Sequence, residues 1–408
     1  MTPPRLAPLL IRASTLTSAL GAGSFAHLQA LRERRSGVRP MSWETVSDLP
    51  TCLGEVDGVD EQKLPEPLAR FDCRNNRLAW LAMQQDGFMQ QVRGAVERHG
   101  PARVGVFMGT STSGILTTEQ AYRRRDPATG ALPANFDYRH THNSFSLADF
   151  VRTGFGLQGP ASVVSTACSS SAKVFGVAQR MIAAGLIDAA VVGGVDSLCL
   201  TTLYGFNSLQ LLSGQPCRPF DVERCGINIG EAAGFALVER LDGGQGSHPE
   251  PGDILVSGVG ESSDAHHMSA PHPQGLGARL AMGQALTQAG LTPQDIGHVV
   301  LHGTSTPSND AAESLAVEAL FGLETPCSSI KGHTGHTLGA AGVLNALVGE
   351  LALRHDFAPA GVGTQVVDPA LRCRYLTENL PRPMRHVMSN AFGFGGSNCS
   401  LVLSKVMP

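Results

Sequence analysis

The segment TACSSSAKVFGVAQRMIAAG (residues 166–185) begins at the end of the apolar run ASVVSTA (161–167) and leads into a second apolar run, DAAVVGGV (188–195). Apolar side chains recur in it at helical spacing, at Val174, Phe175, Val177, Ala178, Met181 and Ile182, and Gly185 ends the pattern. A strand–helix–strand unit of this kind predicts an α/β protein with a mostly parallel, buried sheet.

A faint internal repeat extends this unit to the whole chain. VGVFMGTSTSG (104–114) resembles HVVLHGTSTPS (298–308), and GFALVER (234–240) resembles NCSLVLS (398–404). The opening segment aligns without gaps on TGHTLGAAGVLNALVGELAL (334–353), which pairs Cys168 with His336. Because the three matches keep the same order, we expect two related α/β halves, residues 1–243 and 252–408, on either side of the linker-like LDGGQGSHPEPGD (241–253). A pseudo-twofold packing would bring Cys168 and His336 together.

Composition excludes several classes of protein. The chain has 408 residues and a formal net charge of −4, which does not suggest a nucleic-acid binder. Its nine cysteines show no CxxC pairing, which indicates a reducing, cytoplasmic compartment and argues against a disulfide scaffold or zinc site. Arg12 interrupts the first apolar run, so we expect a strand there and no signal peptide, and no stretch is long and apolar enough to predict a membrane span.

Cys168 precedes the expected helix, and this position has two interpretations. Free cysteine is often simply buried. A helix N-terminus, however, carries partial positive charge and unpaired amides, which lower the pKa of a thiol and stabilise an oxyanion. The second interpretation predicts covalent catalysis by Cys168, and it requires a proton carrier nearby.

Candidate proton carriers stand in the second half of the chain. His302 ends an apolar strand in LHGTSTPSNDAAE, and Lys331, His333 and His336 precede a helix in SSIKGHTGHTLGAAG. The HxxH spacing of His333 and His336 resembles a metal motif, but no third ligand follows at a suitable distance, so we expect no metal site. The glycine-rich SNAFGFGGSNCSLVL (389–403) lacks the lysine and the helix of a phosphate-binding loop.

Five motifs in this order, TACSSS, PFDVERCGINIGEAAG, HGTSTPSND, KGHTGHTLGAAG and FGFGGSN, resemble the elongating β-ketoacyl-[acyl carrier protein] synthases (types I and II). The resemblance implies a thiolase-like fold, in which two pseudo-repeated halves form a layered α-β-α-β-α core. His336 argues against the type III enzymes, which use Cys–His–Asn, and Cys168 argues against chain-length factors, which lack the cysteine.

The resemblance also implies a role for each matching residue. Cys168 would accept the acyl group, His302 and His336 would hold the malonyl thioester carbonyl, and Lys331 and Glu313 would support the histidines. The amides of Cys168 and Phe394 would form the oxyanion hole. Thr304, Thr306 and Ser269 would bind the phosphopantetheine arm, and Thr112, Phe206 and Phe392 would line the substrate pocket.

The expected function is therefore decarboxylative condensation of an acyl-enzyme with malonyl-[acyl carrier protein], in fatty-acid or in specialised polyketide or polyene elongation. The alternative is a non-catalytic or chain-length-determining subunit of a heterodimer. The expected partners are an acyl carrier protein, and a second copy or a ketosynthase-like subunit. No cofactor is expected beyond the carrier's phosphopantetheine.

Three further features lead to separate expectations. Arg123, Arg124 and Arg125, with Arg70, are expected to dock the acidic carrier protein, although an ordinary solvated charge run is an equally good interpretation. Cys225 stands where the family commonly has aspartate. His333 stands where a small or apolar residue is usual, and we expect it to be a bystander.

Overall fold

A continuous sheet of 12 strands crosses the molecule, and the computed structural model describes residues 5–43, 49–241 and 248–408. The strands of the N-terminal half are β1 (Leu9–Ser18), β9 (Ala232–Arg240), β7 (Ala189–Asp196), β5 (Val104–Gly109) and β6 (Ala161–Val164). Those of the C-terminal half are β10 (Ile254–Ser263), β17 (Ser397–Lys405), β16 (His386–Gly393), β11 (His298–Val300), β12 (Pro326–Ser328) and β14 (Arg374–Tyr375). Short strands β2 (Gly21–Ala22), β3 (Arg39–Pro40), β4 (Cys52–Gly54), β8 (Ile229–Gly230), β13 (Phe357–Ala358) and β15 (Leu380–Pro381) complete the set.

The strand order repeats in the two halves. Outward from the centre, the order is β1–β9–β7–β5–β6 on one side and β10–β17–β16–β11–β12 on the other. In each half this is the first, fifth, fourth, second and third strand of the unit. The halves meet where β1 pairs with β10 in antiparallel register, with Leu9 opposite Val256. The three sequence repeats fall on equivalent strands and helices, so the predicted duplication is confirmed.

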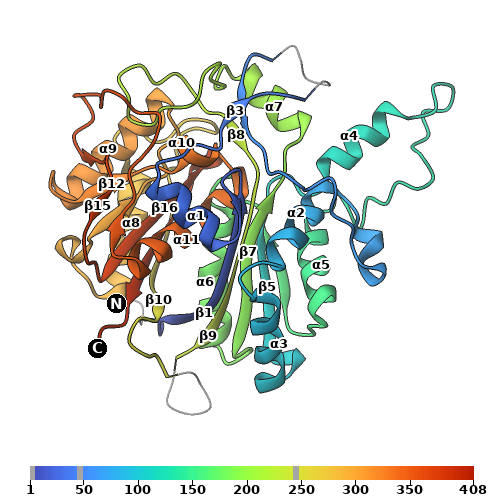
Figure 1. Ribbon diagram of the computed structural model, residues 1–408, viewed down its shortest axis with the longest axis horizontal. Coiled ribbons are helices and arrows are strands. Elements are labelled where there is room, and N and C mark those ends of the chain that lie inside the picture. Colours follow the sequence, from blue (N-terminus) through green and yellow to red (C-terminus); the bar gives the residue numbers. More distant parts are fainter. Residues whose placement is uncertain (1–4, 44–48, 242–247) are drawn as a thin grey trace.

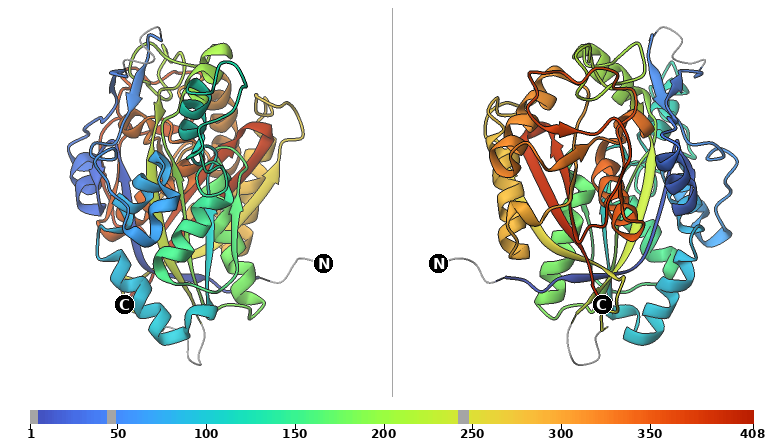
Figure 2. Two further views of the ribbon diagram at one scale, coloured as in Figure 1. Left: turned by 90° about the vertical axis from the view of Figure 1, so that its right-hand side faces the viewer. Right: turned by 60° about the vertical axis from the view of Figure 1, so that its left-hand side comes forward.

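Eleven helices accompany the strands within the described residues. They are α1 (Ser24–Arg32), α2 (Arg74–Met83), α3 (Phe88–His99), α4 (Ile115–Arg123), α5 (Phe145–Phe155), α6 (Ser170–Ala183), α7 (Leu200–Ser208), α8 (Leu276–Ala289), α9 (Pro307–Phe321), α10 (Lys331–Thr334) and α11 (Ala341–Arg354). Figure 1 shows helices alternating with the two halves of the sheet, and α6 and α11 lie side by side in the central layer between these halves. Helices α2, α3 and α5 cover the outer face of one half, and α8 and α9 cover that of the other, as the second view of Figure 2 also shows.

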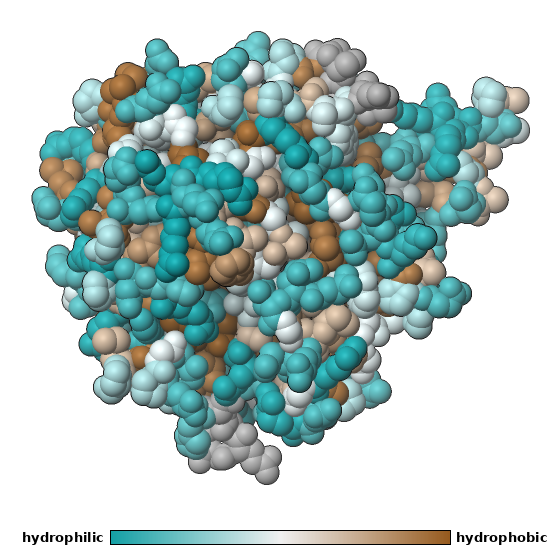
Figure 3. Space-filling model, in the orientation of Figure 1, coloured by the Kyte–Doolittle hydropathy of each residue, from teal (hydrophilic) through white to brown (hydrophobic). Residues whose placement is uncertain are grey.

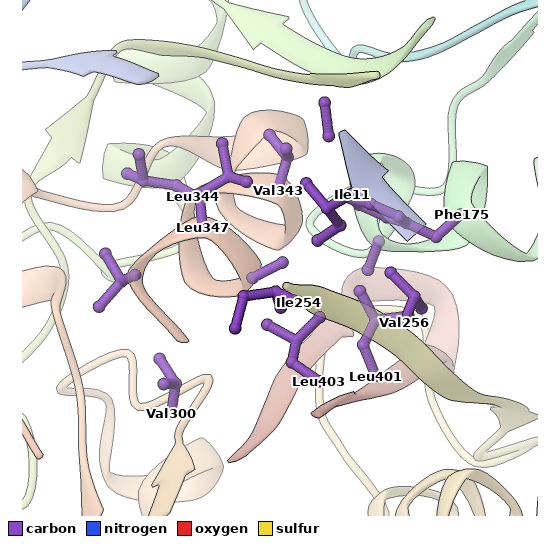
Figure 4. Close-up of a cluster of buried hydrophobic side chains, with 14 of the residues drawn as sticks. Ile11, Phe175, Ile254, Val256, Val300, Val343, Leu344, Leu347, Leu401 and Leu403 are labelled. Carbon is purple, nitrogen blue, oxygen red and sulfur yellow. The ribbon is translucent and has the colours of Figure 1, made fainter. Parts of the chain in front are cut away.

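Alternating apolar side chains explain the layers. On β7, Ala190 and Val192 point into the central core, while Ala189 and Val191 point toward the outer helices. A similar alternation occurs on other long strands such as β9 and β16, so each half of the sheet is covered on both faces. Figure 4 shows Ile11, Phe175, Leu347 and Leu403, from both halves, meeting in the central layer. This core fixes α6 and α11 relative to each other.

The carboxyl ends of the strands lead directly into the two central helices. A Cβ at Gly109, the last residue of β5, would stand 2.4 Å from the amide nitrogen of Ser171. Only glycine allows this approach, which sets the start of α6 against the end of β5. The residues just before α6 and α11 are therefore held at the same edge of the molecule.

The expected linker is only partly described by the structure. Residues 242–247 of the expected linker, 241–253, lie outside the described residues. Within the described residues, no helix combines the length and the apolar character needed to span a membrane.

Candidate active site

The three residues singled out as chemical groups lie together. Cys168 precedes α6, His336 precedes α11, and His302 follows β11. All three are buried, and a ligand-type atom from each lies within 4.8 Å of the other two. The imidazole rings of His302 and His336 stand almost perpendicular, at 81°, with their centroids 5.4 Å apart. The structure thus brings a thiol and two imidazoles into one site.

The backbone around the two repeated positions is alike. Ala167, before Cys168, has a φ of 52°, and the equivalent Gly335, before His336, has a φ of 71°. Glycine adopts this conformation without strain, whereas alanine does so at a cost of about 1 kcal/mol or more. The strained turn at Ala167 directs the thiol of Cys168 away from the helix and into the site.

His336 has a defined tautomer. The amide of Leu338 donates to its Nδ1 at 3.2 Å, so the proton of the neutral ring is on Nε2. Burial and the neighbouring Lys331 ammonium hold the pKa of His336 well below its usual value. The ring is therefore a neutral N–H donor, which suits hydrogen bonding to a carbonyl oxygen.

Two buried charged residues hold the backbone of His302. Glu313, on α9, accepts the amides of His302 at 2.8 Å and Gly303 at 2.7 Å. Lys331, at the start of α10, donates from Nζ to the carbonyl oxygen of His302. Burial, Lys331 and His336 keep the pKa of His302 well below its usual value, so this ring is neutral as well.

Lys331 and Glu313 influence each other through this arrangement. Burial lowers the pKa of Lys331 to about 8, although the Glu313 charge opposes the shift. Burial raises the pKa of Glu313 to about 7, against the hydrogen bonds from the amides of Gly303 and His302. Neither side chain lines the cavity, so both act on the site through the His302 backbone and through charge.

The thiol of Cys168 differs from the expectation. Burial raises its pKa to about 11, and the Lys331 charge, the amide of Phe394 and its own amide only partly offset the rise. The sequence argument counted the helix N-terminus and omitted desolvation, which is the larger effect here. Helix α6 also begins at Ser170, two residues after the thiol.

The expected pair of amides is nevertheless present. The amides of Phe394 and Cys168 both act on the Cys168 sulfur. A Cβ at Gly393 would stand 2.7 Å from the carbonyl oxygen of Thr166 and 3.3 Å from the amide nitrogen of Cys168. The glycine-rich loop therefore packs directly on the turn that carries the thiol, and the two amides lie beside the sulfur; their role as an oxyanion hole stays a prediction.

A pocket of about 590 Å³, the open solvent at its mouth included, reaches the thiol. Nine of the residues expected at the site are in its wall, namely Cys168, His302, His336, Phe394, Thr304, Thr306, Ser269, Phe206 and Phe392. Thr304 and Thr306 join their hydroxyls at 2.9 Å. The roles assigned to these residues stay predictions, but their positions agree with them.

Thr112 is the expected residue that does not line this cavity. Its hydroxyl donates to Asp196 Oδ1 at 2.9 Å and accepts the amide of Ser197 at 3.3 Å. The side chain is buried in the turn between β5 and α4, against the end of β7. The expectation that it borders the acyl group of this cavity needs correction, because its polar atom is used by the scaffold.

Sequence reasoning missed Asp264, which lines the cavity. Its carboxylate accepts from the side chain of Asn398 at 3.0 Å, and its amide donates to the carbonyl of Gly396 at 2.8 Å. Asp264 thereby ties its own loop to the glycine-rich loop. An acidic residue directly after the apolar run of β10 was the available signal.

His333 lies outside the site. Its ring nitrogens face the carbonyl oxygens of Arg35, at 2.9 Å, and Ala360, at 3.0 Å. It therefore connects the segment after α1 to the segment after β13. Cys225 is exposed, and its sulfur lies 3.3 Å from the hydroxyl of Ser213.

Comparison with known proteins agrees with this geometry. The model of the β-ketoacyl synthase N-terminal domain matches residues 11–243, and that of the C-terminal domain matches residues 254–365. The chain is 30% identical over 401 residues to 3-oxoacyl-[acyl-carrier-protein] synthase 2 of Coxiella burnetii, covering 93% of this chain and 94% of that protein. It is 38% identical over 267 residues to the mitochondrial 3-oxoacyl-[acyl-carrier-protein] synthase of Arabidopsis thaliana, covering 62% of this chain and 58% of that protein.

Among solved structures, the chain resembles the ketosynthase ApeO in complex with its chain length factor ApeC from Xenorhabdus doucetiae. The two are 40% identical, the TM-score is 0.88, and the match covers 100% of both chains.

Proposed function

The chain belongs to the β-ketoacyl synthase family of acyltransferases, and we propose that it condenses an acyl group held on Cys168 with malonyl-[acyl carrier protein] to give a 3-oxoacyl product. One observation carries the proposal. The thiol of Cys168 and the rings of His302 and His336 lie within 4.8 Å, beside two convergent amides.

The first half-reaction loads the enzyme. The Cys168 sulfur attacks the carbonyl carbon of a carrier-bound acyl thioester, a C–S bond forms to Cys168, and the C–S bond to the carrier breaks. The carrier thiol leaves with the proton of Cys168. The amides of Cys168 and Phe394 hold the negative oxygen of the intermediate.

The second half-reaction forms the carbon–carbon bond. His302 and His336 hold the carbonyl oxygen of the malonyl thioester, carbon dioxide leaves, and the electron pair of the broken bond remains as an enolate. Its α-carbon attacks the acyl carbonyl on Cys168, and the thiolate departs and takes up one proton. Neutral imidazoles suit this step, because each can donate an N–H hydrogen bond to the thioester carbonyl oxygen.

A second, ketosynthase-like subunit is the partner we propose beside the carrier. Strand β6 ends the sheet, whereas its counterpart β12 is covered by β14. Residues 161–164 of β6 read ASVV, without charge or proline to block pairing of the open edge. The solved complex of ApeO with its chain length factor supports a heterodimer as the assembly.

The proposal places the reaction in the cytoplasm and requires no cofactor other than the carrier's phosphopantetheine. The nine cysteines are free thiols, which suits a reducing compartment. A specialised pathway that pairs the synthase with a chain length factor is favoured over primary fatty-acid elongation by the 40% identity to ApeO, whose structure contains such a factor.

The test separates the two roles in the site. Cys168→Gln is expected to abolish condensation and to retain carbon dioxide release from malonyl-[acyl carrier protein], because His302 and His336 remain. Acyl transfer is followed by intact-protein mass spectrometry and decarboxylation by carbon dioxide release. A wild-type protein that takes up no acyl group and releases no carbon dioxide, with or without its partner subunit, would favour the non-catalytic alternative.

A further inference from the structure

Helix α7 begins without a capping side chain of its own. Cys199 occupies the cap position in an extended conformation and makes no side-chain cap hydrogen bond. The first amides of the helix instead donate to the carboxylate of Glu119 on α4, from Leu200 at 2.9 Å and from Thr201 at 2.7 Å. The hydroxyl of Thr201 donates to the same carboxylate at 2.5 Å. A side chain from a different helix therefore satisfies the amides that normally need an N-cap.

Helix α4 lies against α7, while the buried side chains of α7, Leu200 and Leu203, pack in a cluster from other segments of the chain. Among the described elements it is the one that packs most extensively against α7, and Figure 1 shows the two helices side by side. Glu119 joins them at the end where α7 leaves the sheet. A change in the position of α4 is consequently passed to α7 through this carboxylate.

The other end of α7 reaches the site. Phe206, in its last turn, lies in the cavity wall, and its ring centroid is 5.6 Å from that of Phe394. The amide of Phe394 acts on the Cys168 sulfur. Gly395, next along the chain, has a φ of 79°, so the loop that carries Phe394 bends at a residue with few steric limits. The ring of Phe206 therefore packs against the residue whose amide faces the thiol.

Helix α4 also leads into a projecting segment, residues 124–144 between α4 and α5, which we call the arm. Figure 1 shows the chain after α4 extending away from the body, and Figure 3 shows this projection covered mainly by hydrophilic side chains. Arg123 lies one turn after Glu119 on α4, and Arg124 and Arg125 follow it. The same helix thus carries the expected carrier-docking arginines and the carboxylate that caps α7.

We propose that Glu119 is a positioning residue, which holds α7 so that Phe206 supports Phe394 and its amide at the thiol, and which links the arm to the oxyanion hole. The inference rests on the proposed function for its catalytic meaning. The series of contacts from α4 through α7 to the amide of Phe394 is independent of that function.

The rate at which the Cys168 thiol is alkylated tests this series of contacts and does not require the protein to catalyse condensation. Loss of the Phe394 amide removes one group that favours the thiolate of Cys168. At a fixed pH below the pKa of the thiol, the rate of alkylation by iodoacetamide follows the thiolate fraction. We expect Glu119→Ala to slow alkylation of Cys168 by about threefold or more, and Glu119→Gln, which keeps one acceptor oxygen, to restore part of the rate.

Asp86 provides a matched control. Its carboxylate accepts the amide of Ser24 at 2.9 Å and the hydroxyl of Ser24 at 3.0 Å, at the start of α1. Helix α1 has nine residues, as α7 has, and contributes no residue to the cavity wall. We expect Asp86→Ala to lower the melting temperature as Glu119→Ala does, without slowing alkylation.

The double variant Glu119→Ala/Phe206→Ala completes the test. If Glu119 acts through Phe206, its removal has no further effect on alkylation once Phe206 is absent. Equal slowing by Asp86→Ala and Glu119→Ala, or additive effects in the double variant, would overturn the inference. In a protein that proves inactive in condensation, the alkylation rates still decide the path, so the two failures are distinguishable.

Discussion

Accessibility, rather than acidity, distinguishes Cys168 from the other buried thiols. Burial raises the pKa of Cys168 to about 11 and that of Cys73, Cys199 and Cys217 to about 12. Among these four, only Cys168 lies in the cavity wall. Its attack therefore depends on the Lys331 charge and the two amides, which favour the thiolate once the substrate carbonyl has arrived.

We predict that Cys168 is the only cysteine acylated by carrier-bound acyl groups. The rival is Cys225, which is exposed and so open to adventitious transfer. Peptide mapping of the acylated protein should place the added mass on Cys168, and Cys225→Ser should label like the wild type. A label that persists at another cysteine in Cys168→Ala would contradict the prediction.

The two site histidines are expected to serve condensation more than loading. Removing one preorganised donor costs about 10²–10³ in rate, so His302→Ala and His336→Ala should each lower condensation by that factor. Self-acylation of Cys168, measured by mass spectrometry, should stay largely intact. An equal loss of both reactions would mean that the histidine mainly assists the thiol.

His333→Ala is the matched control for these variants. It should retain condensation per folded molecule, because the ring faces the carbonyls of Arg35 and Ala360 and not the cavity. A buried carbonyl left without its donor costs about 1–3 kcal/mol, so the melting temperature should fall. A loss of turnover as deep as that of His336→Ala would show that His333 contributes to the site.

Much of the site could be predicted at this scale because the motifs carry it. The positions of Cys168, His302 and His336 followed from polar residues at the ends of apolar strands and from the repeat. The thiol pKa and Thr112 could not be predicted, because both depend on what surrounds the residue in space. Desolvation exceeds the local amides at Cys168, and Asp196 takes the hydroxyl of Thr112.

At the scale of elements, the arm after α4 presents the expected carrier surface. Arg70, from the segment before α2, and Arg124 both border one surface groove, together with Asp72 and Asp137. The sequence grouped Arg70 with the arginines of the arm, and the structure places the two segments side by side. The carboxylates of Asp72 and Asp137 reduce the positive charge of this groove. We therefore expect Arg123 and Arg125, which do not line it, to contribute to the attraction of the acidic carrier protein.

We predict that reversing the charge of Arg123, Arg124 and Arg125 to glutamate raises the KM for the acyl carrier protein and flattens its dependence on salt. Exposed charges are screened beyond about 8 Å at physiological ionic strength, so the wild-type KM should rise with added salt. The kcat at saturating carrier should change little, since the variant leaves Glu119 in place. An unchanged KM would remove the arm from the docking surface.

The helices and strands themselves were predictable to different degrees. The periodic segment 174–182 is helical as expected, within α6, because its apolar spacing matches the central core. The arm and the contact of α4 with α7 left no comparable pattern. Glu119 caps a helix about 80 residues away in the chain, and a single glutamate carries no sequence signal for such a contact.

At the scale of the whole molecule, the site exists only where the two halves meet. Cys168 comes from the N-terminal half and the two histidines from the C-terminal half, and α6 and α11 hold them together in the central layer. The pseudo-twofold predicted from the repeat therefore explains why a thiol and an imidazole occupy equivalent positions. It also packs several titratable groups into the dry interior.

Five fully buried histidines, His27, His298, His302, His333 and His336, have a pKa below the usual value because burial disfavours the imidazolium. For His27 the pKa falls to about 4, and for His298 to about 3. In the unfolded chain each takes up a proton near pH 6.5. Their contribution to stability is therefore complete above pH 6.5 and declines as the pH falls below it.

Glu313 acts in the opposite direction. Its pKa is about 7 in the folded protein, against 4.5 for an ordinary glutamate. Between these two pH values the folded protein binds a proton that the unfolded chain does not, so lowering the pH favours the folded state through this group. A histidine whose pKa falls to about 4 or lower, as for His27 and His298, loses about 2 kcal/mol between pH 7 and pH 5, and Glu313 returns a similar amount. The buried carboxyl groups of Asp196 and Asp310 also have raised pKa values and act with Glu313, but the five histidines outnumber these three groups, so acid lowers the stability on balance.

We predict that the free energy of unfolding falls steeply between pH 6.5 and pH 5, and that the protein unfolds in mild acid before most carboxylates are protonated. Urea unfolding followed by fluorescence at a series of pH values measures the slope. His298→Gln should flatten it by about one histidine's share, because it removes a single buried imidazole outside the cavity wall. His386, whose pKa is lowered but which lies near the surface, provides the comparison, and His386→Gln should change the slope less. A stability that stays constant down to pH 5 would mean that the buried histidines are protonated in the folded protein, and that His302 and His336 are then not the neutral donors that condensation requires.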